Sequence, residues 1–156
     1  MTSMDLYKKL VPVCLMIVFV LICVLFLIFP PNGKLICKAN GVPGEVEFEY
    51  SYIADYKLWF VKHLTVIEKI SSENDESLNT YKEVLENDYQ LFNKVKSVDS
   101  NIEMIDTSLV GTFKVDYEKL NEEDYKIIGS TMKYKNIFVG KLKRIYKKNG
   151  ATCHYE

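Results

Sequence analysis

The sequence has little of the chemistry on which most enzymes depend. Only two of its 156 residues are histidines, His63 and His154, and more than half the chain separates them. It contains no Gly-x-Ser-x-Gly, His-Glu-x-x-His or phosphate-loop motif, which are the common signatures of serine hydrolases, zinc peptidases and nucleotide-binding enzymes. We therefore expect a protein that is not an enzyme and that uses no cofactor. An enzyme with a hidden active site is the weaker alternative.

Cysteine and histidine also lack the arrangement that catalysis or metal binding needs. Cys153 and His154 are adjacent, and adjacent residues of a strand point to opposite faces, so they do not suit a nucleophile and base pair. Cys37, Cys153 and a histidine show no recognisable spacing of metal ligands. We expect no catalytic residue and no metal site.

An excess of charge of either sign is missing as well. The chain has 20 basic and 21 acidic residues and a net charge of −1, so no overall field attracts nucleic acid. Arg144 is the only arginine, and this argues against bidentate recognition of phosphates at several points. We expect no nucleic-acid partner.

What the chain does have is one long hydrophobic run, Leu10 to Phe29, with twenty residues and no charge. A helix of this length is about 30 Å long and matches the hydrocarbon core of a bilayer. A cleaved signal peptide is the alternative, but its apolar region is shorter, and Pro30 and Pro31 stand where cleavage is expected. Without glycine or internal charge, the run predicts an anchor rather than a channel.

The flanking lysines orient this anchor only weakly. Lys8 and Lys9 precede the run and Lys34 and Lys38 follow it, so the terminal amine decides for a cytoplasmic N-terminus. We predict a single-pass protein of the cell membrane that contacts the lipid bilayer through residues 10–29. The predicted parts are a cytoplasmic tail at 1–9, a transmembrane signal anchor at 10–29, a short tether at 30–33 and an extracytoplasmic domain at 34–156.

Four cysteines fall into two groups. Cys14 and Cys23 lie in the apolar run, where they are interpreted as apolar filler, with acylation of Cys14 as the alternative. Cys37 and Cys153 lie near the two ends of the predicted domain. An even pair in an oxidising compartment favours a disulfide, which the chain-entropy model values at about 4 to 5 kcal/mol for so long a loop. Two free thiols are the alternative.

The first part of the domain predicts strands. Residues 34–40 form a short strand before the turn at 41–44, and residues 45–52 alternate strictly between apolar and polar side chains, with glutamates on the solvent face. Residues 57–70 are rich in bulky and β-branched side chains and favour a third strand, although apolar residues at helical spacing leave a helix open.

The second part alternates helices and strands. Residues 76–98 predict an amphipathic helix capped by Ser72 or Asn74. Strands follow at 101–109 and 111–117, with Gly111 as the turn or bulge point between them. Asn121 caps a short helix that stops near Gly129, and a last helix covers 136–148, with Phe138, Leu142 and Ile145 inward and Gly150 as its stop. A strand at 151–156 then brings Cys153 beside Cys37.

This order, βββ-α-ββ-α-α-β, is typical of an α+β domain. We predict a single N-terminal transmembrane helix followed by an antiparallel sheet of about five to six strands, with helices packed on one face.

A basic segment is the most marked charge feature. It has seven basic residues and no acidic one, and those within the last helix lie away from its apolar stripe. A cation near an anionic surface gains about 1 kcal/mol, so contact with anionic lipid headgroups or a wall polymer is one interpretation. The other is a solvated helix face that complements the helix dipole. The segment comprises Lys133, Lys135, Lys141, Lys143, Arg144, Lys147 and Lys148.

The layout resembles small uncharacterised extracytoplasmic proteins of low-GC Gram-positive bacteria and is similar to YehR-like lipoproteins. The likeness covers about Leu35 to Glu156 and rests on the early and late cysteines, the hairpin, the Tyr/Leu helix and VDYEKLNEEDY at Val115 to Tyr125. It implies an extracytoplasmic location and a strand-helix-strand fold, and it implies no reaction.

Together these observations predict a membrane-anchored extracytoplasmic domain that acts as a non-enzymatic binding module at the cell surface, with an unknown protein partner. The alternative is an accessory subunit whose apolar helix packs against another membrane protein. A flat basic or tyrosine-lined surface favours binding, whereas a deep polar pocket favours an enzyme.

Overall fold

The computed structural model describes residues 3–28, 30–41, 44–127 and 137–156, and for residues 3–11 it describes the backbone alone. The chain forms two compact units, Met1–Pro31 and Asn32–Glu156.

The first unit contains one long helix, α1 (Ser3–Ile28), so the predicted helix is confirmed as far as Ile28. Its apolar side chains from Val13 onward are exposed within the chain, and Leu27 reaches 83%. Among the residues that the structure describes, no helix has the length and hydropathy needed to cross a membrane. The predicted role of this helix as a membrane span therefore stays a prediction.

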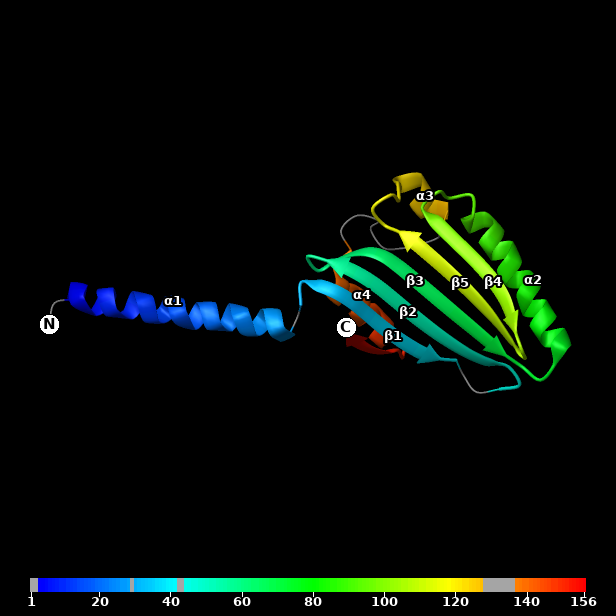
Figure 1. Cartoon of the computed structure of the whole chain (residues 1–156), viewed down its shortest axis with the longest axis horizontal. Coiled ribbons are helices and arrows are strands. Elements are labelled where there is room, and N and C mark those ends of the chain that lie inside the picture. The colour runs from blue at the N-terminus through cyan, green and yellow to red at the C-terminus, as the bar shows by residue number, and fades with distance from the viewer. Residues whose placement is uncertain (1–2, 29, 42–43, 128–136) are drawn as a thin grey trace. The chain divides into compact units, whose positions relative to one another are not determined.

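The second unit is built on one sheet of six strands in the order β4-β5-β3-β2-β1-β6, with every neighbouring pair antiparallel (Figure 1). The predicted α+β class and the order βββ-α-ββ-α-α-β are confirmed. The strands are β1 (Asn32–Asn40), β2 (Glu47–Lys57), β3 (Phe60–Ser71), β4 (Val98–Ile105), β5 (Ser108–Asp116) and β6 (Thr152–Tyr155). The helices are α2 (Asp75–Phe92), α3 (Glu122–Ile127) and α4 (Val139–Lys148).

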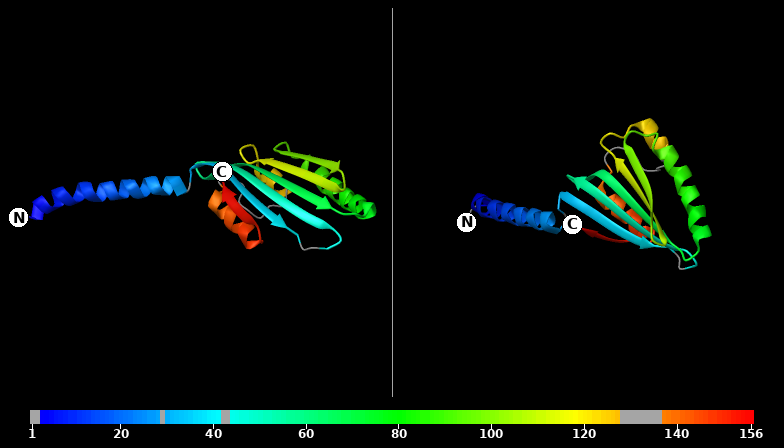
Figure 2. Two further views of the ribbon diagram at one scale, coloured as in Figure 1. Left: turned by 60° about the horizontal axis from the view of Figure 1, so that its bottom comes forward. Right: turned by 45° about the vertical axis from the view of Figure 1, so that its right-hand side comes forward.

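Two helices cover one face of this sheet, as predicted. α2 packs on β4 and β5, and α4 packs on β1 and β6 (Figures 1 and 2). Both lie on the same face, because Phe48 packs into the cluster under α2 while Tyr52, on the same side of β2, packs into the cluster under α4. We call this the inner face.

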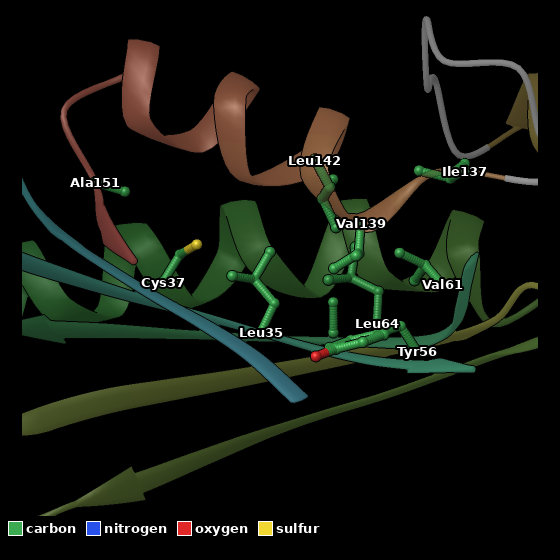
Figure 3. Packing of buried hydrophobic residues seen from close by; sticks show 10 residues of the cluster. Leu35, Cys37, Tyr56, Val61, Leu64, Ile137, Val139, Leu142 and Ala151 are labelled. Carbon is green, nitrogen blue, oxygen red and sulfur yellow. The ribbon is translucent and has the colours of Figure 1, made fainter. Parts of the chain in front are cut away.

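The cluster under α4 joins the sheet to the end of the chain. Leu35, Cys37 and Leu64 point from the strands toward Val139 and Leu142 (Figure 3). The predicted disulfide between Cys37 and Cys153 is confirmed: the two residues are direct partners in the β1–β6 register, and their Cα atoms are 4.1 Å apart.

The alternation of β2 explains why it is a strand. Phe48, Tyr50 and Tyr52 face inward as predicted, while Glu47 and Glu49 are exposed. The strand begins two residues later than predicted, at Glu47, and continues to Lys57, because Ala54 and Tyr56 extend the buried side.

The predicted strand at 57–70 is confirmed from Phe60 onward, and the helical alternative is wrong. β3 begins at Phe60 because Leu58 and Trp59 form the turn of the β2–β3 hairpin, with φ of +52° and +64°. In this register Leu64 and Ile70 are buried against the helices, which a helix at the same place would not allow.

α2 is shorter than the predicted 76–98. Asn74 caps it as predicted, since its Oδ1 accepts hydrogen bonds from the N–H groups of Glu76 and Ser77. The helix ends at Phe92, and Val95 and Val98 are buried beyond it in a turn and in β4. The spacing of these two valines continues the helical pattern in the sequence, although the helix has already ended, and this is why the predicted helix is too long.

The prediction that Gly111 is the turn or bulge point between β4 and β5 is wrong. The turn lies at Asp106, which has φ of +52°, and the strands run earlier than predicted. Gly111 instead stands in the middle of β5, opposite Ile102 of β4 and Glu68 of β3.

The two last helices match the prediction in part. The Asn121 Oδ1 caps α3, while the predicted stop near Gly129 and the predicted start of α4 at 136 lie outside the described residues. Leu142 is buried and Ile145 half-buried, but the inward placement of Phe138 is wrong, because it precedes α4 and is 48% exposed. Gly150 follows α4 with φ of +88°, as expected of a helix stop.

Candidate functional site

Strands β2 and β3 lie in the middle of the sheet, between the strands that α2 and α4 cover. Their inner face carries Tyr50 and Tyr52 from β2 and Val66 and Glu68 from β3, all of them half-buried. We call Tyr50, Tyr52, Glu68 and Tyr89 the tyrosine–glutamate site.

Glu68 faces inward because of the period of its strand. Side chains alternate along a strand, so Glu68 shares its face with Val66 and Ile70. In the register of the sheet it stands directly between Tyr50 on β2 and Gly111 on β5. Glu68 therefore places its carboxyl group among apolar and aromatic side chains on the helix-covered face.

Aromatic rings form a row along β2. The Phe48 and Tyr50 ring centroids are 6.4 Å apart and those of Tyr50 and Tyr52 are 6.3 Å apart, with interplanar angles of 5° and 10°. At one end of the row Phe48 meets Tyr81 of α2 edge-on at 5.3 Å, and at the other end Tyr52 stacks on Tyr146 of α4 at 4.2 Å. The row thus runs from one helix to the other.

Tyr89 reaches the same place from α2. Its hydroxyl lies over Gly111, where a Cβ atom would come within 2.7 Å of the Tyr89 Oη. The ring is held by Phe92 and Phe113, with centroid distances of 6.4 and 6.1 Å. Because Gly111 has no side chain, the Tyr89 hydroxyl has room above this residue, which is the partner of Glu68 on the neighbouring strand.

Burial controls the ionisation of this site. The pKa of Glu68 is raised because burial penalises the carboxylate and the charge of Asp88 adds to this, while the hydrogen bond from the Tyr50 hydroxyl opposes it. Burial, with the charge of Glu68, raises the pKa of Tyr50 to about 12 and that of Tyr89 to about 12. Both phenols are therefore protonated donors at neutral pH.

Glu68 has no cationic partner among the described residues, where every ion pair of a lysine or histidine involves another acidic group. On the opposite face of the sheet, by contrast, Lys69 pairs with Glu49 at 3.7 Å. A half-buried carboxylate beside several aromatic rings can accept an organic cation, because both the charge and the ring faces attract it.

The structure describes five of the seven residues of the predicted basic surface, whose role stays a prediction. Lys141, Arg144, Lys147 and Lys148 are exposed on α4. Lys143 differs, since its Nζ lies 3.9 Å from the centre of the Tyr155 ring and burial lowers its pKa. The two remaining predicted residues, Lys133 and Lys135, lie outside the described part of the chain.

The histidines lie apart from this site. His63 stands near Asp116 and Glu118, and one ligand atom from each residue lies within 4.8 Å of the others. Lys119 already pairs with Asp116 at 2.9 Å and Lys62 with Glu118 at 2.7 Å, so a cation would have to compete with two ammonium groups.

Sequence reasoning missed Glu68. The signal was available, because residues 64, 66, 68 and 70 read Leu, Val, Glu and Ile, and this places one carboxyl on the apolar side of a strand. The Tyr50–Tyr52 face was predicted, but nothing local in the sequence connects Tyr89 or Gly111 with it.

No protein-family model matches the chain, and no curated protein matches it. Two solved structures are similar to it. The NMR structure of the E. coli YehR protein has a TM-score of 0.53 and 18% sequence identity over 78% of this chain and 91% of that one. The NMR structure of a protein from Streptococcus pneumoniae TIGR4 has a TM-score of 0.48 and 15% identity over 77% of this chain and 85% of that one. The expected similarity to YehR is therefore confirmed for the fold alone.

Proposed function

We propose that this chain is a membrane-anchored extracytoplasmic binding module, not an enzyme, and that the tyrosine–glutamate site takes a ligand bearing an ammonium group. The single observation that carries the proposal is the half-buried Glu68, which stands beside Tyr50 without a cationic partner in the described residues.

The anchoring part of the proposal rests on the apolar run. Leu10 to Phe29 contains no charged residue, and the described apolar side chains of α1 make no core within the chain. Each Leu, Ile, Val or Phe contributes roughly −0.3 to −0.6 kcal/mol to insertion at mid-membrane. The disulfide supports placement of the domain on the oxidising side of the membrane.

The binding part rests on complementary chemistry. A cation over a tyrosine face gains about 0.5 to 2 kcal/mol, depending on how far it is desolvated. The carboxylate of Glu68 adds attraction in a half-buried setting where water screens less. The hydroxyls of Tyr50 and Tyr89 remain protonated and orient polar groups of the ligand.

We also propose a second contact through α4. Its exposed Lys141, Arg144, Lys147 and Lys148 come from a helix without an acidic residue. Such a face suits anionic lipid headgroups or an anionic wall polymer. At the tyrosine–glutamate site we propose a protein partner, with a lysine side chain supplying the ammonium group.

Titration of the full chain in lipid nanodiscs with Nα-acetyl-lysine amide, followed by tyrosine resonances in NMR spectra, tests the site. We expect Glu68→Gln, which keeps the size and a hydrogen-bonding group, to weaken binding at least tenfold. The matched control is Glu49→Gln, which removes a carboxylate from the exposed outer face of the neighbouring strand and leaves binding unchanged. Equal binding by both variants, or none by the unmodified chain, refutes the proposed ligand class.

The size of the extracted particle distinguishes a lone anchor from the alternative, an accessory subunit of a membrane complex. Extraction in mild detergent and size-exclusion chromatography give a single-chain particle if α1 is a lone anchor. A larger stoichiometric complex supports the accessory role.

A further inference from the structure

The turn between β2 and β3 has an unusual sequence for its shape. Its two central residues, Leu58 and Trp59, both have positive φ, +52° and +64°. A two-residue hairpin turn of this kind normally holds asparagine, aspartate or glycine, because a bulky side chain is strained there. The strained pair therefore indicates a use for these side chains that outweighs the cost to the turn.

The turn is held firmly in this shape. The Leu58 N–H donates to the Asn32 Oδ1 at 2.9 Å, and the Val139 N–H donates to the Trp59 carbonyl at 2.8 Å. The Val61 N–H also donates to the carbonyl of Ile137 at 2.9 Å. The segment before α4 is thus bonded along the same end of β3.

These bonds gather apolar side chains at one place. Leu58 is 60% exposed, Phe138 48% and Phe60 39%, and the Phe60 and Phe138 rings meet edge-on at 6.3 Å. Trp59 is half-buried at the edge of the cluster under α4. We call Leu58, Trp59, Phe60 and Phe138 the apolar tip.

The apolar tip lies at the end of the sheet where the chain enters the domain. β1 begins beside the turn between β2 and β3 (Figure 1). Asn32, the first residue of β1, is the direct partner of Lys57 in β2, one residue before Leu58. Asn32 follows Ile28, the last residue of α1, by four positions. A chain of that length spans at most about 14 Å.

We propose that the apolar tip inserts into the lipid–water interface. The inference rests on the proposed anchoring of residues 10–29, because the covalent chain then keeps Asn32 and its partner strand near the headgroups. The headgroup layer is about 5 to 8 Å thick on each side of the hydrocarbon core. Tryptophan and other aromatic side chains are favoured at that depth, and the exposed Lys57 beside them suits anionic headgroups.

The test uses Trp59, which is the only tryptophan of the chain. The full chain is reconstituted in phosphatidylcholine and phosphatidylglycerol vesicles that contain lipids brominated near the headgroup, and its fluorescence is compared with that in unbrominated vesicles. We expect the brominated lipids to quench at least a third of the emission, and acrylamide in the buffer to quench it less than it quenches the detergent-solubilised chain.

A variant at Leu58 tests whether the exposed side chain, and not the shape of the turn, is responsible for the quenching. Leu58→Asn suits the positive φ and keeps the turn, and we expect it to reduce quenching by the brominated lipids at least twofold. The matched control is Leu91→Gln on α2. Leu91 is 53% exposed and belongs to a helix that packs on β4 and β5, and we expect the quenching to stay unchanged there.

Flotation of the same vesicles in a density gradient distinguishes the possible failures. A chain that floats while Trp59 is not quenched by lipid overturns this inference and leaves the anchor standing, as expected if the tip docks on a protein. A chain that does not float overturns both. Equal quenching of the unmodified chain and Leu58→Asn shows that Leu58 does not enter the interface and overturns the inference.

Discussion

Glu68 costs the fold some stability at neutral pH. Its pKa in the folded chain is raised, mainly by burial. Because its pKa is raised, Glu68 contributes to the stability of the fold in its protonated form. That contribution is fully present below the pKa of Glu68 in the unfolded chain and is lost as the pH rises through its pKa in the folded chain. At neutral pH the ionised carboxylate of Glu68 therefore destabilises the folded chain, and a bound cation reduces this destabilisation.

The first prediction follows from this sign. Glu68→Gln raises the free energy of unfolding at pH 7 by about 0.5 to 1 kcal/mol, after allowance for solvent screening of a half-buried group. The difference from the unmodified chain shrinks toward pH 4, where Glu68 is protonated. Urea unfolding at the two pH values measures it. Glu49→Gln, as the control, changes stability little at either pH, and a destabilised Glu68→Gln at pH 7 contradicts the prediction.

Binding has the opposite pH dependence. A cation needs the ionised form of Glu68, so the affinity for Nα-acetyl-lysine amide falls as the pH is lowered. Because the pKa is raised, this loss begins at a higher pH than for an ordinary carboxyl. Titrations between pH 7.5 and 4.5 give the midpoint, and an affinity that does not change over this range contradicts the role of Glu68.

At Leu58 the proposed membrane contact also lowers the stability of the fold, because the side chain occupies a strained position in the turn. Leu58→Asn places a residue that tolerates positive φ in the turn and raises the free energy of unfolding by about 0.5 to 1 kcal/mol. Chemical denaturation of the full chain in detergent shows the gain. Loss of stability in this variant means that the leucine side chain supports the fold and that the turn is not strained at this residue.

Gly111 and Tyr89 make a pair that only the structure reveals. Gly111→Ala destabilises the domain by about 1 to 3 kcal/mol, because the new Cβ meets the Tyr89 hydroxyl while Phe92 and Phe113 hold the ring. Tyr89→Phe removes that hydroxyl and recovers a large part of the loss in the double variant. Denaturation of the four chains of this cycle tests it, and purely additive effects refute the contact.

At the level of elements, the disulfide fastens the shortest described strand. β6 has four residues and, among the strands that the structure describes, pairs with β1 alone. The variant with both Cys37→Ala and Cys153→Ala loses about 2 to 5 kcal/mol of unfolding free energy, because the bridge closes a separation of 116 residues. In this variant, amide hydrogen exchange accelerates more in β6 than in β5. Uniformly unchanged exchange rules out this fastening role.

The elements themselves were largely predictable from the sequence. Strand alternation in β2 and the caps Asn74 and Asn121 are local signals, and the structure has them where expected. The end of α2 and the place of Gly111 were mispredicted, because buried residues beyond a helix keep its spacing and a glycine in a strand resembles a turn. Tertiary packing decides both.

The candidate site was less predictable than the fold. The tyrosine face of β2 follows from its alternation, whereas for the apolar residues at 58–60 the sequence predicts a strand and not a turn. Which acid stands opposite Tyr50, and which helix brings Tyr89 over Gly111, depend on the register of three strands. Register is a long-range property that a single sequence states only indirectly.

For the whole molecule, the predicted orientation is tested through its thiols. In intact cells that produce the chain, a membrane-impermeant thiol reagent labels it only after reduction, because Cys37 and Cys153 are bridged. Labelling without reductant contradicts the bridge. Labelling that requires cell lysis contradicts the outward position of the domain.

The arrangement of β1 has a mechanical consequence. It is the strand through which the chain enters the domain, and it lies between β2 and β6, antiparallel to both. A pull on residue Asn32 acts along this strand and loads the hydrogen bonds of both ladders in shear, so they must yield together rather than one by one. A covalent bridge ties β1 to β6 under the same load. The domain is thus built to resist tension at the residue where a tethered protein would feel it.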